Sequence, residues 1–131
     1  MEGTTTMMES KAGETIQFPF DNESWLTRHK YEIPASALTF FPRDALGARG
    51  KADEKTFPTR GKDVEFQYVD SNGNSIATSN CDIATRNGGA MRPRDNTGMR
   101  KFIEASRAAV GDSISITKID TRHYKVELTK R

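Results

Sequence analysis

The alternation of apolar and polar positions is clearest near the C-terminus, over residues 97–128. Apolar residues first recur at three- and four-residue steps, as on one face of an amphipathic helix, at Met99, Phe102, Ile103 and Ala109. Gly111 and Asp112 follow them, and glycine accepts the left-handed conformation that closes a helix while aspartate favours turns. The pattern therefore predicts one helix that ends at a Gly-Asp corner.

After that corner the period changes from helical to strict alternation. The apolar positions of this stretch are Ile114, Ile116 and Ile119, and then Tyr124, Val126 and Leu128. Polar residues separate them, and residues 120–122 form a polar turn between the two runs. Alternation with a period of two is typical of strands with one buried face, so this stretch predicts a terminal hairpin.

Shorter patterns of the same kind occupy the rest of the chain. Strands are predicted over residues 16–20, 31–33, 64–68 and 75–81. Pro19 favours an edge position for the first of them, Asn72-Gly73 predicts a hairpin between the last two, and Pro34 and Pro42 bracket a short helix over residues 35–40. The stretches without a period predict loops over residues 21–28, 43–62 and 82–96.

This order gives about six strands and two helices, a mixed and mainly antiparallel β fold that favours a closed or half-closed barrel. With 131 residues, 34% of them hydrophobic and 29% charged, the chain suits a single domain over residues 14–131, after a mobile leader over residues 1–13. The two long loops are uncommon in so small a domain unless they are functional.

Composition also bears on the compartment and on metals. No apolar run approaches the roughly 18 residues that span a bilayer, and no signal-peptide pattern precedes the first strand. Cys81 is the only cysteine and so cannot form an internal disulfide, which agrees with a reducing compartment. We therefore expect a soluble, cytoplasmic protein, associated with the nucleoid in a prokaryote. No Cys/His set has zinc-ligand spacing, so we expect no metal.

The net charge of +2 is unevenly distributed. Residues 1–24 hold five acidic residues and one basic residue, so the remainder carries +6. Residues 86–107 hold six basic residues against two acidic ones. That density suits a phosphate-rich partner, although a solvated face balanced by nearby acids is an equally simple explanation.

The order of these parts resembles the B3-type DNA-binding domain, a pseudobarrel found in plant transcription factors and in recognition domains of restriction endonucleases. The resemblance rests on the Asn72-Gly73 hairpin and on two segments, LTRHKYEIPASALTFFP (residues 26–42) and TGMRKFIEASRAAVGDSISITKI (residues 97–119). The FFPRD of residues 40–44 and the Tyr124 hairpin are most similar to the restriction-associated members. The fold class implied is mainly β with two helices (α+β), an open pseudobarrel of about six to seven mostly antiparallel strands.

The resemblance also implies two arms that enter the major groove of duplex DNA. We name them the first arm (residues 22–30) and the second arm (residues 82–95). Arginine can fork onto guanine and asparagine can pair with adenine, so the candidates for base contacts are Arg28, Arg86, Asn87, Arg92 and Arg94. The candidates for phosphate contacts are Thr27, Lys30, Arg100 and Lys101.

Several of these residues also have an ordinary structural interpretation. Trp25 either stacks on a sugar or base, or plugs the edge of the core, which is the commoner role for a lone tryptophan at such a place. Asn87, which precedes two glycines, suits a tight turn. Arg100 and Lys101 suit the solvated face of a helix.

The sequence gives little support to an enzyme. The acids available to a metal-dependent nuclease are Asp63, Glu65, Asp70 and Asp82, and no lysine accompanies them in a catalytic pattern. We therefore expect sequence-specific binding of double-stranded DNA without catalysis or a cofactor, by a stand-alone protein or by the recognition domain of a larger nuclease. The alternative is a protein-binding adaptor or inhibitor that presents Trp25, Met91 and arginines from the same loops.

Overall fold

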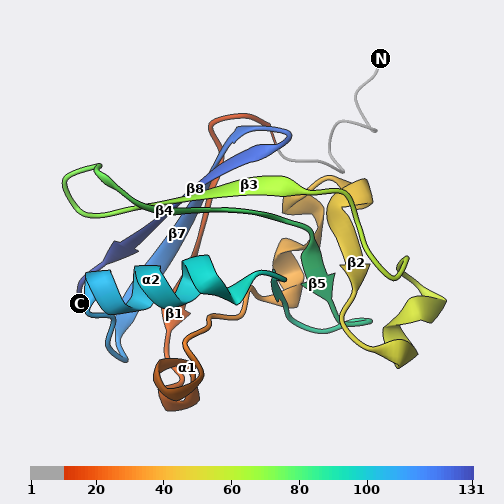
Figure 1. Cartoon of the computed structure of the whole chain (residues 1–131), viewed down its shortest axis with the longest axis horizontal. Helices are drawn as coiled ribbons and strands as arrows, with labels where there is room; N and C mark the ends of the chain where they lie inside the picture. Colours follow the sequence, from red (N-terminus) through yellow and green to blue (C-terminus); the bar gives the residue numbers. More distant parts are fainter. Residues whose placement is uncertain (1–10) are drawn as a thin grey trace.

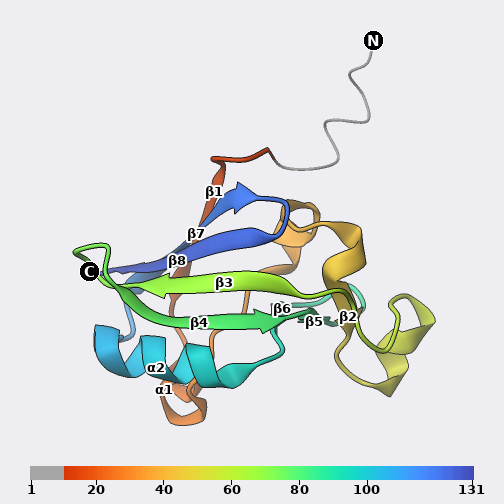
Figure 2. The ribbon, with the colours of Figure 1, turned by 45° about the horizontal axis from the view of Figure 1, so that its top comes forward.

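The computed structural model describes residues 11–131, so the expected leader lies outside the described residues except for residues 11–13. Five strands form one mixed sheet in the order β1, β7, β8, β3, β4, and Figure 2 shows them side by side in this order. Only the β3–β8 pair of this sheet is parallel. The strands are β1 (Thr15–Phe20), β3 (Val64–Val69), β4 (Ser75–Cys81), β7 (Asp112–Asp120) and β8 (His123–Thr129).

Three strands of three residues each form a second sheet beside the first (Figure 1). They are β2 (Leu46–Ala48), β5 (Ile83–Thr85) and β6 (Met91–Pro93), with β2 parallel to β5 and β5 antiparallel to β6. The fold is mainly β with helices, which confirms the expected α+β class. Its two sheets do not close into a barrel, so the pseudobarrel is open. Residues 11–131 contain eight strands, because the expected loops over residues 43–62 and 82–96 hold these three short ones.

The longer helix, α2 (Asn96–Ser106), packs on β3 and β4 (Figure 2). It begins at Asp95, whose carboxylate accepts a hydrogen bond of 3.0 Å from the Thr97 N–H. It was expected to extend to Ala109, but it ends at Ser106. Arg107 adopts the left-handed conformation, with φ at 51°, and its N–H bonds back to the carbonyl groups of the last turn.

A second helix, α1 (Glu23–Arg28), stands where the sequence predicted a loop over residues 21–28. The Asn22 side chain accepts a hydrogen bond of 2.9 Å from the Ser24 N–H and so caps the helix. His29, with φ at 55°, closes its other end. Six residues are too few for a helical period to be visible in the sequence, and the capping contacts define this helix instead.

Three 3-10 helices connect these parts: η2 (Ala35–Phe40), η3 (Arg43–Ala45) and η4 (Lys51–Lys55). The first is the short helix that Pro34 and Pro42 predicted, wound more tightly than an α-helix. The strand expected over residues 31–33 is reduced to one bridge, in which Ile33 and Met91 pair antiparallel. The predicted edge position of β1 and the hairpin between β3 and β4 are confirmed.

The alternation of β7 keeps its period of two as far as Ile119. Ile114 and Ile116 are fully buried as predicted, but Ile119 is 50% exposed while Lys118 is buried. Lys118 therefore faces inward in phase with Ile114 and Ile116, and Ile119, an odd number of positions from them, faces outward. The expectation that Ile119 belongs to the core is therefore wrong.

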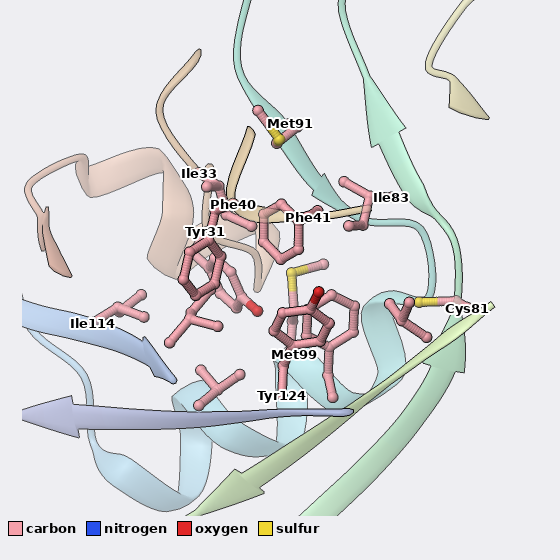
Figure 3. Close-up of a cluster of buried hydrophobic side chains, with 14 of the residues drawn as sticks. Tyr31, Ile33, Phe40, Phe41, Cys81, Ile83, Met91, Met99, Ile114 and Tyr124 are labelled. Carbon is pink, nitrogen blue, oxygen red and sulfur yellow. The ribbon is translucent and has the colours of Figure 1, made fainter. Parts of the chain in front are cut away.

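The core lies between the inner face of the five-stranded sheet, the short sheet and α2, and Figure 3 shows part of it. It is rich in aromatic residues, and the Tyr31 and Tyr68 hydroxyl groups are hydrogen-bonded at 3.1 Å within it. Burial raises the pKa of Cys81 to about 11, so this thiol is protonated at neutral pH. The ordered arms described below are built on this packed interior.

Gly98 is the point of closest approach between α2 and the sheet. A Cβ atom placed there would collide with the Ser79 hydroxyl and lie 2.8 Å from Cε2 of the buried Tyr68 ring. Alanine favours a helix over glycine by about 1 kcal/mol, whereas overpacking a core costs about 1–3 kcal/mol. Because Tyr68 is fully buried and bonded to Tyr31, we expect the collision to outweigh the gain.

We therefore expect Gly98→Ala to lower the free energy of unfolding by about 1–2 kcal/mol, measured by urea denaturation. Thr97→Ala is the matched control, because Thr97 is exposed one position earlier in the same helix. A Gly98→Ala protein as stable as the wild type would show that the sheet yields at this contact.

Candidate functional site

The first arm contains α1 and is attached to the core by Trp25. This side chain is only 8% exposed, and its ring meets Phe20 edge-on with centroids 5.3 Å apart. Its position corresponds to the core plug and does not leave it available for stacking on a base. Thr27 and Arg28, by contrast, are exposed, and among residues 11–131 the Arg28 side chain forms no hydrogen bond or ion pair.

The second arm is a small hairpin built from β5 and β6. Arg86 and Asn87 follow β5, and Gly88 supplies the turn with φ at 69°. The Arg86 N–H donates to the Ala90 carbonyl at 3.3 Å, and the Gly89 N–H donates to the Arg86 carbonyl at 3.2 Å. The hairpin therefore carries Arg86 at an ordered tip, where its side chain is exposed.

Asn87 connects this tip to the neighbouring η4 segment. Its side-chain oxygen accepts a hydrogen bond of 3.0 Å from the Thr56 hydroxyl, and its backbone N–H donates to the Asp53 carboxylate at 2.8 Å. The Thr56 bond holds the Asn87 amide toward the η4 segment. Asn87 therefore links the tip of the second arm to the η4 segment.

The base of the second arm is held by a buried ion pair. Asp82, 1% exposed, accepts hydrogen bonds from the Arg94 guanidinium at 2.7 and 3.0 Å and from the Gly61 N–H at 2.9 Å. Arg94 also donates to the carbonyl oxygens of Ala48, at 2.9 Å, and Thr59, at 3.3 Å. We name this group the Asp82–Arg94 clamp. Its contacts occupy Arg94, which sequence reasoning had assigned to base contacts.

A depression of about 330 Å³ lies between the two arms. Its walls include residues of the first arm, residues of the second arm, and two side chains from elsewhere, Glu32 and Arg49. The lining residues are Asn22, Ser24, Trp25, Lys30, Glu32, Arg49, Arg86, Gly89 and Ala90. The fold thus brings together the two arms that the resemblance implied.

Positive charge gathers at this depression around a single carboxylate. Glu32 binds Lys30 at 2.7 Å and the two terminal nitrogens of Arg49 at 2.6 and 2.7 Å, while Arg92 approaches it to 4.0 Å. Arg86 also lines the depression. Four cations against one carboxylate give this cationic cluster a net charge of +3.

The pKa shifts follow from this crowding. Burial alone would raise the pKa of Glu32, but the hydrogen bonds from Arg49 and Lys30 outweigh it, and the pKa is lowered. The pKa of Arg92 is lowered by burial and then by Arg49, partly offset by Glu32. Glu32 is therefore fully ionised at neutral pH, and it offsets the repulsion between Arg92 and the neighbouring arginines.

The structure thus separates the candidate residues into groups. Three candidates line the depression, namely Trp25, Lys30 and Arg86, and Arg92 lies beside it. Trp25 also packs against Phe20 in the core, and Asn87 and Arg94 have structural contacts. The other four candidates, Thr27, Arg28, Arg100 and Lys101, are exposed and lie outside the lining. Sequence reasoning missed Glu32 and Arg49. Arg49 had only a weak signal, a basic residue before Gly50 in a long loop.

Two further properties concern the described part of the chain alone. Within residues 11–131, His, Cys, Asp and Glu side chains form no group of three or more that could hold a metal ion. In the same residues, none of the helices combines the length and the apolar character needed to cross a membrane.

No known protein-family model matches this chain, and no curated protein does either. Two solved structures have a similar fold. The hypothetical Arabidopsis thaliana protein At1g16640.1 is similar with a TM-score of 0.51 and 17% identity, over 93% of this chain and 97% of that one. The N-terminal domain of Helicobacter pylori LlaJI.R1 is similar with a TM-score of 0.50 and 14% identity, over 88% of this chain and 87% of that one. The fold is B3-like. At such identities the likeness shows the fold alone.

The Asp82–Arg94 clamp gives a direct test of the structural role of Arg94. We expect Arg94→Ala to lower the free energy of unfolding by about 3 kcal/mol, because it leaves the buried Asp82 carboxylate without its cation. Arg86→Ala is the matched control at the exposed tip and should change stability by less than about 0.5 kcal/mol. If urea denaturation shows that both variants lower the free energy of unfolding by the same small amount, Arg94 does not have the structural role assigned to it.

Proposed function

We propose that this chain binds double-stranded DNA with the face formed by its two arms, and that it does so without catalysis. The observation that carries the proposal is that Lys30, Arg49 and Arg86 line one depression between the arms, with Arg92 beside it. Phosphates supply most of the affinity of proteins for DNA, and a concave site of one sign attracts a polyanion.

Exposure and contacts decide which residues are assigned to bases and which to phosphates. Arg86 at the hairpin tip and Arg92 beside it are the best placed to fork onto guanine in the major groove. Thr27 and Arg28 on the first arm are exposed groups that can bind phosphate, as are Arg100 and Lys101 on α2. Binding that uses both kinds of contact would be sequence-specific.

The fold that this chain shares with the N-terminal domain of LlaJI.R1 is a second, independent support for the proposal. LlaJI.R1 belongs to a restriction system, and the domain that resembles this chain is its N-terminal domain. We propose by analogy that this chain recognises DNA in a restriction-type system inside the cell, either alone or beside a nuclease domain.

The alternative, a protein-binding adaptor, would need exposed apolar side chains on the arms. Trp25 is 8% exposed and Met91 is fully buried, so neither is offered to a protein partner. What the arms expose is mainly cationic and polar, which suits a nucleic acid better than an apolar protein surface.

The test is selection from a randomised duplex pool, followed by sequencing of the bound fraction and anisotropy titrations at two salt concentrations. We expect the wild type to enrich a short motif and to bind less tightly as salt rises, because DNA binding releases counterions. Arg86→Ala with Arg92→Ala should lose the enrichment, at a cost of about 1–3 kcal/mol for each bidentate base contact. Arg94→Ala is unsuitable here because it would disturb the clamp.

Lys125→Ala is the matched control, since Lys125 lies on the outer face of β8 and pairs there with Glu127 at 3.6 Å. It should leave the motif unchanged. The proposal fails if the wild type binds neither the unmodified pool nor a pool with methylated bases at low salt. It also fails if the double variant enriches the same motif as the wild type.

A further inference from the structure

Glu32 is the only acidic residue that lines the depression between the arms, within the part of the chain that the structure describes. Its side chain is 15% exposed, and both oxygens are engaged by cations. Arg49 forks onto the carboxylate with one nitrogen on each oxygen, and Lys30 binds Oε2. A forked arginine with a lysine beside it is also the arrangement that recognises phosphate.

Stability alone does not explain this arrangement. Collecting charged groups at a half-covered site costs desolvation, and apolar residues of similar volume often stabilise a protein as well or better. Glu32 also lies 4.0 Å from Arg92, which the proposed function places near base edges. The carboxylate therefore touches the groups that would bind phosphate and approaches one that would read a base.

We propose that Glu32 is a specificity-determining residue: it competes with DNA phosphates for Lys30 and Arg49, and it holds Arg92 in position for base contact. The inference rests on the proposed DNA binding. Glu32 lowers the net charge of the cationic cluster from +4 to +3 and so weakens the attraction to any duplex. Contacts to base edges lose less, so the ratio of specific to non-specific affinity rises.

The test compares wild type and Glu32→Gln on a random duplex and on the duplex enriched by selection, over a range of salt. We expect Glu32→Gln to bind the random duplex at least about threefold more tightly, with a salt slope steeper by about 0.9, as for one added phosphate contact. Its ratio of specific to non-specific affinity should fall about tenfold, because Arg92 is no longer held in position.

Two further variants separate charge from positioning. Glu32→Gln with Arg49→Gln restores the net charge of +3 without the pair, so its affinity for the random duplex should return to the wild-type value. Its specificity ratio should remain low. Glu127→Gln removes a carboxylate on the outer face of β8, beside Lys125, and should change the ratio by less than about twofold. Thermal melting of each variant verifies that it folds. If Glu32→Gln does not fold, the double variant carries the test, because it leaves neither Glu32 nor Arg49 charged.

The outcomes distinguish this inference from the proposal beneath it. If Glu32→Gln weakens binding to both duplexes by the same factor with an unchanged salt slope, Glu32 is only structural and the inference is overturned. An unchanged specificity ratio in the double variant also overturns it. If neither the wild type nor any Glu32 variant binds a duplex at low salt, the proposed function itself is wrong, and this inference falls with it.

Discussion

The Asp82–Arg94 clamp is the interaction on which the arrangement of the arms depends. One carboxylate and one guanidinium join the start of β5, the end of β6, the carbonyl of Ala48 in β2 and the loop that carries Thr59 and Gly61. The two ends of the hairpin thus meet two segments of residues 48–61 at one buried charge pair. Such a pair is costly to bury and more costly to break, so it fixes the position of these segments more than it adds net stability.

The clamp allows a short hairpin to act as a rigid arm. Three-residue strands have little stability of their own, but both ends of this hairpin are tied, and Asn87 is bonded to the η4 segment. The first arm is fixed differently, by Trp25 in the core and by the caps of α1. Because both arms are fixed, Lys30 and Arg86 line the same depression, and its charge is organised in advance of binding.

The sequence predicted the parts whose periods are long enough to read. The alternation of β7 and β8 and the amphipathic pattern of α2 gave their type and approximate bounds, because many residues repeat one rule there. The short elements could not be read in this way: α1 depends on its caps at Asn22 and His29, and β2, β5 and β6 are too short to show a period. The structure brings the two arms that the resemblance implied to one depression, yet composition could not separate Arg94, used within the fold, from Arg86, because both are arginines in one basic loop. Glu32 was missed because partners distant in sequence, Arg49 and Arg92, define its role.

The central claim is that the face between the two arms is where DNA binds. The most direct measurement is NMR chemical-shift mapping of the backbone amides while a short duplex of the selected sequence is added. We expect the largest changes within residues 22–32 and 83–92 and at Arg49, with little change at Lys125 and Glu127 on the outer face of β8. Changes concentrated on that outer face, or spread evenly over the surface, would contradict the account.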